Sequence, residues 1–130
     1  MRNPAKDSET EQLAAELVDT AFKVHHALGP GLLEVVYEVC LCQELSSRGI
    51  PFNRQVSIPI VYEGVTLDAG LRLDIVVANS ILVEIKAVEK LIPLFDAQVL
   101  TYLKLTELPL GLLINFNVPL FKNGIKRFVR

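Results

Sequence analysis

The chain has 130 residues, 51% of them hydrophobic, and a formal net charge of −2 at pH 7. This size and apolar fraction favour one globular domain, and the acidic balance argues against a protein that coats nucleic acid through bulk positive charge. The sequence contains neither an 18-residue apolar run nor a signal-peptide pattern. It therefore predicts a protein that does not enter a membrane and is cytoplasmic by default.

The N-terminal part of the chain predicts a helix. Residues 1–10 are expected to be a frayed start, and residues 11–130 to form the single domain. The segment from Ser8 to Glu11 offers a capping box. Apolar residues then recur at helical spacing as far as Leu28.

A second helix is predicted over about 31–47, after the break at Gly29-Pro30-Gly31. It is apolar nearly all round, which is typical of a buried helix. Gly49 is its expected end. Cys40 and Cys42 lie two apart on this helix and face different directions, so we interpret them as small core residues without a mutual disulfide.

Period-2 alternation follows the helices and predicts strands. A half-buried strand covers about 52–62, and Glu63-Gly64 is its turn. Two further strands are expected over about 66–77 and 81–88, joined at Ala78-Asn79-Ser80.

The C-terminal third predicts a helix over about 95–106, a buried strand over 110–116, and a hairpin over 120–129 around Asn123-Gly124. The element order is therefore ααβββαβ with a short extra strand. A strand–helix–strand passage implies one parallel pairing, so the expected fold class is α/β (α+β) with a mixed central sheet flanked by helices.

Three charged residues stand inside the two most apolar, β-branched segments of the chain. Glu84 and Lys86 are two apart on one strand and share a face, and Asp74 lies on the preceding strand. Burial of an ionised side chain without a partner costs several kcal/mol or more. These charges therefore lie either on a solvated strand face or around something that needs them.

The loop between the two strands decides which interpretation is possible. A two-residue turn at Asn79-Ser80 places Asp74 opposite Ile85, on the wrong face. A three-residue loop over 78–80 places Asp74 opposite Glu84, and opposed residues of an antiparallel pair point the same way.

Two adjacent carboxylates repel each other, and a hard divalent cation would relieve that repulsion. Oxygen ligands suit Mg²⁺ or Mn²⁺, and the backbone carbonyl of Ile85 could add a ligand to those of Asp74 and Glu84. Lys86 could orient an attacking water or stabilise charge on a phosphate. The alternative is a solvated ladder of Arg72, Lys86 and Glu84.

At these residues the chain resembles the PD-(D/E)XK nuclease superfamily, and more closely its GxxExxY family. The naming motif stands as Gly31-Leu-Leu-Glu34-Val-Val-Tyr37, and the resemblance covers about residues 12–130. The matching segments are VHHALGPGLLEVVYE, LDIVV, LVEIKA, AQVLTYLKLT and GLLINF.

This resemblance implies a restriction-endonuclease-like αβββαβ core and a nuclease-type site. Asp74 and Glu84 would be the metal carboxylates and Lys86 the catalytic lysine. Glu34 would be an additional acid, and Gln98 the active-site glutamine of the later helix. The implied cofactor is Mg²⁺ or Mn²⁺, and the implied substrate is DNA or RNA.

Three further residues are candidates for supporting the site, each with a structural alternative. Tyr37 lies beside Glu34 on the second helix, whose acids could instead occupy a narrow exposed edge. Tyr102 shares a face with Gln98, but that face could be ordinary helix surface. His25 could line the site or be a core histidine with its hydrogen bonds satisfied.

Four basic residues and no acidic residue occur from Lys122 to Arg130. Arg72, Lys126 and Arg127 are the candidate phosphate contacts, although a solvated strand would explain the last two. We expect a metal-dependent nuclease, alone, as a homodimer or with a partner protein. The alternatives are a non-catalytic module that binds nucleic acid or a partner, and a structural subunit with an apolar interface.

Overall fold

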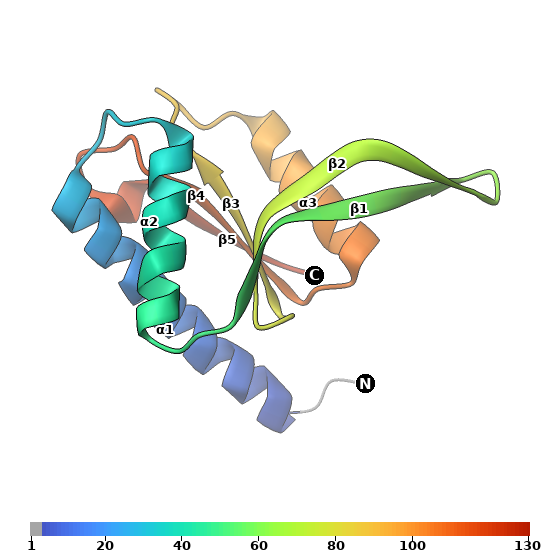
Figure 1. The fold of residues 1–130 in the computed structure, drawn as a ribbon, viewed down its shortest axis with the longest axis horizontal. Coiled ribbons are helices and arrows are strands. Elements are labelled where there is room, and N and C mark those ends of the chain that lie inside the picture. Colours follow the sequence, from blue (N-terminus) through green and yellow to red (C-terminus); the bar gives the residue numbers. More distant parts are fainter. Residues whose placement is uncertain (1–3) are drawn as a thin grey trace.

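The computed structural model describes residues 4–130 (Figure 1). Side chains are described for residues 7–130. Its elements follow the expected order ααβββαβ with an added strand. They are α1 (Pro4–Leu28), α2 (Glu34–Ser47), β1 (Phe52–Tyr62), β2 (Val65–Val77), β3 (Ile81–Lys86), α3 (Pro93–Thr106), β4 (Leu110–Asn115), the 3-10 helix η1 (Phe121–Asn123) and β5 (Ile125–Val129).

The five strands form one sheet in the order β1-β2-β3-β4-β5. β3 and β4 are parallel and every other neighbouring pair is antiparallel. The α3 helix makes the crossover between the two parallel strands, as parallel pairing requires. The mixed sheet and the α/β fold class are therefore confirmed.

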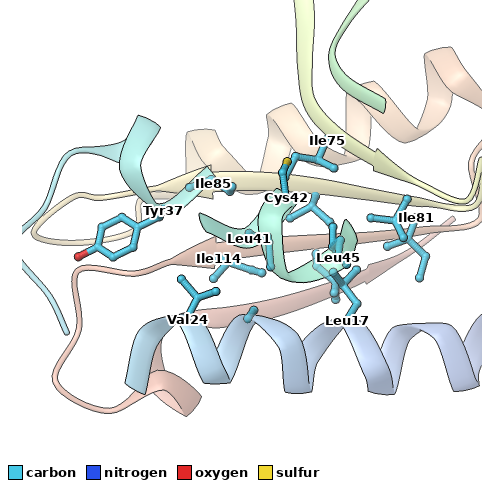
Figure 2. Packing of buried hydrophobic residues seen from close by; sticks show 14 of the residues in the cluster. Leu17, Val24, Tyr37, Leu41, Cys42, Leu45, Ile75, Ile81, Ile85 and Ile114 are labelled. Carbon is cyan, nitrogen blue, oxygen red and sulfur yellow. The ribbon is translucent and has the colours of Figure 1, made fainter. Parts of the chain in front are cut away.

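Helices cover both faces of the sheet (Figure 1). Figure 2 shows side chains of α1 and α2 meeting those of β2, β3 and β4 on one face. On the other face α3 approaches closely because β4 has no side chain at Gly111. A Cβ there would lie 2.9 Å from Cγ1 of Val99.

The α2 helix ends where the sequence predicts. Gly49 takes a φ of +70°, the left-handed conformation that glycine adopts at little cost. The N–H groups of Gly49 and Ile50 donate to the carbonyls of Ser46 and Leu45 at 3.0 and 2.9 Å. The last carbonyls of the helix are satisfied in this way, and the chain turns into β1.

Several local expectations are wrong. The α1 helix begins at Pro4, where a first-turn proline is tolerated, so Ser8 is not a helix cap and most of the segment expected to be frayed is helical. Residues 1–3 lie outside the described residues.

The α2 helix begins at Glu34 and leaves Val35 and Val39 about half exposed. It is buried on one face only, which carries Tyr37, Leu41 and Leu45.

The expected hairpin around Asn123-Gly124 is also wrong. Residues 121–123 form η1, and β5 pairs with β4 instead. Gly124 lies where a Cβ would come 2.1 Å from the carbonyl oxygen of Asn115, so this glycine permits close backbone approach and does not form a hairpin turn.

Both cysteines are free, with Cys42 buried and Cys40 half-buried. Within residues 4–130, no helix combines the length and hydrophobicity of a membrane span.

The β1–β2 hairpin extends beyond the rest of the sheet (Figure 1). Its two strands pair from Phe52–Val77 out to Tyr62–Val65. The pairing of β2 with β3 covers only three residue pairs and ends at Ile75–Val83. The two strands therefore part at the next position, which is Asp74 on β2 and Glu84 on β3.

Candidate active site

Asp74 and Glu84 come together where β2 and β3 diverge. The pairs Ile75–Val83 and Val77–Ile81 enclose a three-residue loop over 78–80. This confirms the register that brings Asp74 to Glu84. The loop can reverse the chain because Ala78 and Asn79 take φ values of 50° and 53°.

The two carboxyl groups take over the hydrogen bonds that the strands no longer make. The N–H of Ile85 donates to Oδ2 of Asp74 at 2.8 Å. The N–H of Asp74 donates to Oε1 of Glu84 at 3.2 Å. Each acid thus binds the backbone of the other strand, which holds the two carboxyl groups side by side at the point of divergence.

Burial changes the acidity of this pair. The Glu84 side chain is 7% exposed, and burial, followed by the charge of Asp74, raises the pKa of Glu84 to about 8. The pKa of Asp74 is also raised, chiefly by burial. The hydrogen bond between the two carboxyl groups favours a proton on Glu84. At neutral pH this pair therefore holds a proton and carries less than its full negative charge.

Lys86 lies on the same strand face as Glu84. Its positive charge partly opposes the rise in the pKa of both acids. Its Nζ is 4.5 Å from the ring centroid of Phe95 at the start of α3, a cation–π contact. Arg72 is exposed and pairs with Ser57 of β1. The alternative of an Arg72–Lys86 charge ladder is therefore wrong, because β2 has left β3 before it reaches Arg72.

The α3 helix forms one wall of the site. Phe95, Gln98 and Tyr102 are spaced i, i+3 and i+7, so they share one helix face. Burial and the charges of Glu84 and Asp74 raise the pKa of Tyr102. Gln98 is half-buried on the same face. It lies between Phe95, which contacts Lys86, and Tyr102, whose pKa the two acids raise.

Glu34 lies at the margin of the site. It is the first residue of α2 and is exposed. Partial burial of its carboxyl group, with the charge of Asp74, raises its pKa, and Lys86 opposes the shift. Within residues 7–130, no three His, Cys, Asp or Glu side chains cluster as a metal site. Asp74 and Glu84 are the acids that meet, and the role of Glu34 as an additional acid stays a prediction.

A comparison with family models gives a match to the PD-(D/E)XK nuclease superfamily over residues 11–128. The chain belongs to the PD-(D/E)XK nuclease superfamily. Comparisons with curated proteins and with solved structures gave no match. Membership suggests a nuclease-like function that acts on nucleic acid, and the assignment to the GxxExxY family stays a prediction.

This nuclease-superfamily domain has a second buried acid, which the sequence pattern did not indicate. Glu38 is 4% exposed and accepts hydrogen bonds from Nε of Arg54 at 2.6 Å and from Nε2 of Gln55 at 2.8 Å. Burial and the charge of Glu38 raise the pKa of the neighbouring Cys42 to about 11, so that thiol is a poor nucleophile. Alternation along β1 marks Gln55 as a surface residue, which hid the contact.

Two of the expected supporting residues have structural roles in this superfamily member. The hydroxyl of Tyr37 donates to the carbonyl of Gly29 at 2.6 Å and accepts from the N–H of Leu32 at 3.2 Å. Nε2 of His25 is 2.6 Å from the carbonyl of Val118. These contacts fix the segments after α1 and β4, and His25 is the core histidine of the alternative interpretation.

The basic C-terminal strand is neutralised by the rest of the domain. Lys126 forms an ion pair with Asp96 of α3. Arg127 forms a two-pronged ion pair with Glu11 of α1. These partners lie more than 25 residues away in the sequence, so a count of basic residues along the strand overstates its charge.

Proposed function

We propose that this chain is a metal-dependent phosphodiesterase of nuclease type, in the GxxExxY family of its superfamily. The observation that carries the proposal is the pairing of the buried Glu84 with the half-buried Asp74, with Lys86 on the same strand face as Glu84. Burial of adjacent carboxyl groups is costly, and uncharged amides such as Asn and Gln could accept the same two backbone hydrogen bonds. A cation site gives this arrangement a purpose.

The donor set suits a hard divalent cation. Two carboxylates at one point supply oxygen ligands for Mg²⁺ or Mn²⁺, and the carbonyl of Ile85 would add a third oxygen. In a strand, the C=O of a residue points to the same side as its N–H, and the N–H of Ile85 points at Asp74. When bound, the metal would polarise a phosphate oxygen and lower the pKa of a coordinated water.

The other residues would act on the substrate and the water. Lys86 would stabilise the negative charge that develops on the phosphate during attack, with its ammonium held by Phe95. Gln98 and Tyr102 would bound the site on the α3 side and orient water by hydrogen bonds. Glu34 would act from the margin of the site, where the charges of Asp74 and Lys86 both affect its pKa.

A non-catalytic module that binds nucleic acid is the second candidate. The observation in its favour is that residues 7–130 contain no cluster of three metal-binding side chains. A proton on Glu84 would then settle the repulsion in place of a metal. The two candidates differ in their response to a divalent cation.

Thermal unfolding with and without Mn²⁺ separates these candidates. Mn²⁺ at 100 times its Kd would stabilise the folded wild type by about 2.7 kcal/mol and raise its Tm. Asp74→Asn and Glu84→Gln should lose this rise. Glu89→Ala, which changes an exposed acid outside the site, should keep it. A wild type that does not respond to Mn²⁺ or Mg²⁺ would contradict the proposal.

Cleavage assays then test the chemistry. The purified protein is incubated with single-stranded DNA, duplex DNA and RNA in Mg²⁺ or Mn²⁺. Lys86→Ala should lower cleavage at least about a hundredfold, the usual scale for loss of one charge-stabilising group. Lys90→Ala, which removes an exposed lysine nearby, is the matched control. Equal cleavage by the wild type and Lys86→Ala would indicate a contaminating nuclease.

A further inference from the structure

The face of the β1–β2 hairpin that packs beneath α1 and α2 changes at Asp74. On the loop side of Asp74, Ile75 and Val77 pack into the core beneath α1 and α2. Beyond it, Leu71 and Leu73 belong to the core beneath α3. All four are odd-numbered, and a regular strand would keep them on one face. The face of β2 therefore changes at Asp74.

The packing face of β1 changes at the same place along the hairpin. Phe52 packs beneath α1 and α2, whereas Val56 and Ile58 pack beneath α3. Between them, Gln55 has a φ of +54°, a left-handed conformation that few residues other than glycine adopt. The change of face in β1 therefore coincides with a single backbone residue in an unusual conformation.

Gln55 and Asp74 also leave the hydrogen-bonded register. The pairs on either side are Arg54–Ile75 and Val56–Leu73, and Gln55 is not paired with Asp74 between them. The N–H of Asp74 is directed to Oε1 of Glu84 instead. The gap in the β1–β2 ladder is thus the place where Asp74 becomes available to β3.

Glu38 forms hydrogen bonds with Gln55 and with the residue before it. Oε1 of Glu38 accepts the side-chain amide of Gln55 at 2.8 Å, and Oε2 accepts Nε of Arg54 at 2.6 Å. Glu38 is buried on α2, a rigid element that packs on the sheet. Charge-assisted hydrogen bonds of this kind are among the stronger ones in proteins, so α2 clamps β1 at the point of turnover.

We propose that Gln55, clamped by Glu38, is a positioning residue for the Asp74–Glu84 pair. Its left-handed conformation turns the hairpin over and directs Asp74 toward Glu84 and Ile85. The inference rests on the proposed function, since the pair is the proposed metal site. Gln55 itself would contact neither metal nor substrate.

Two substitutions separate the backbone conformation from the side chain. Gln55→Val removes the amide and disfavours a positive φ, because a β-branched residue is strained there. Gln55→Gly removes the same amide but keeps the positive φ accessible. Mn²⁺ binding is measured by calorimetry, and the amide resonances of Asp74 and Ile85 by NMR in metal-free protein.

Gln55→Val should weaken Mn²⁺ binding about tenfold or more, which corresponds to about 1.4 kcal/mol, and should shift both amide resonances. Gln55→Gly should stay within about threefold of the wild type, with both resonances close to their wild-type positions. The proposal is overturned if Gln55→Val matches the wild type in both measurements. It is also overturned if Gln55→Gly loses as much as Gln55→Val.

The NMR comparison keeps the two proposals distinct. If the wild type binds no Mn²⁺, the proposed function fails, but the metal-free amide shifts still decide whether Gln55 sets the position of Asp74. Glu38→Gln removes the charge of the clamp and should shift the same two resonances in the direction of Gln55→Val. Unchanged resonances in Glu38→Gln would count against Glu38 as the clamp.

Discussion

The N–H of Asp74 donates to Oε1 of Glu84 at 3.2 Å across two diverging strands. An acid that accepts a backbone hydrogen bond usually has a lowered pKa. Here burial dominates, and the pKa of Glu84 rises to about 8. The site is therefore strained electrostatically when both acids are ionised.

The stability of the metal-free protein should fall as the pH rises from about 4.5, the usual pKa of glutamate, to about 8. In this range the folded state holds a proton on Glu84 that the unfolded state has released, so deprotonation favours unfolding. One such proton changes the free energy of unfolding by up to about 1.4 kcal/mol per pH unit. Urea unfolding in EDTA at several pH values measures the slope.

Glu84→Gln is the control for this pH dependence. It removes the titrating group but keeps a side chain of the same size, so it should flatten the slope between pH 5 and 8 to a large extent. The raised pKa of Asp74 acts in the same direction and leaves a smaller residual slope. An unchanged slope in Glu84→Gln would show that other groups cause it.

Phe95→Leu should loosen Lys86. The contact between the ammonium and the ring is worth about 0.5–2 kcal/mol, and leucine keeps an apolar side chain without the π face. We expect faster acylation of Lys86 by an amine-reactive reagent, followed by mass spectrometry, and a fall of about tenfold or less in kcat. Phe95→Tyr should behave like the wild type, and equal acylation in all three proteins would argue against the contact.

Tyr37→Phe should lower stability without affecting the acid pair. It removes the partner of the Gly29 carbonyl and the Leu32 N–H, which costs about 1–3 kcal/mol. Tyr62→Phe changes an exposed tyrosine and should stay within about 0.5 kcal/mol. Urea unfolding gives both values. Loss of the Mn²⁺ response with unchanged stability would instead place Tyr37 in the site.

The three candidate phosphate contacts should differ. Arg127 is already paired with Glu11 on the surface, so Arg127→Ala should cost less than about 1 kcal/mol of stability and leave nucleic-acid affinity unchanged. Lys126→Ala should behave alike, since Asp96 neutralises Lys126. Arg72→Ala should weaken binding and reduce the salt dependence by about one ion. Fluorescence anisotropy over a salt series measures both effects.

The sequence predicted the elements well where periodicity was strong. The alternation along 52–62 and the apolar segments at 81–88 and 110–116 correspond to β1, β3 and β4. The sequence left two loops open between β2 and β3, and each loop implied a definite register because side-chain direction in a strand has a period of two. The three-residue loop of the structure selects the register that brings Asp74 to Glu84.

Local patterns do not indicate partners that come from distant parts of the chain. The resemblance implied Glu34 as an additional acid, whereas the buried glutamate of α2 is Glu38, four residues later. Only the packing of α2 against β1 selects between them, because Arg54 and Gln55 reach Glu38 and not Glu34. The ion pairs of Lys126 and Arg127 could not be predicted either, because their partners Asp96 and Glu11 lie far away in the sequence.

The sequence by itself determined the order of helices and strands, the face shared by Glu84 and Lys86, and the acids available to meet them. The tertiary structure decided that β2 leaves β3 at Asp74 and that the hairpin turns over at Gln55. Alternation assumes a regular strand, and a single left-handed residue breaks that assumption. Contacts with α2 hold that residue in place, so the geometry of the site depends on the assembled fold.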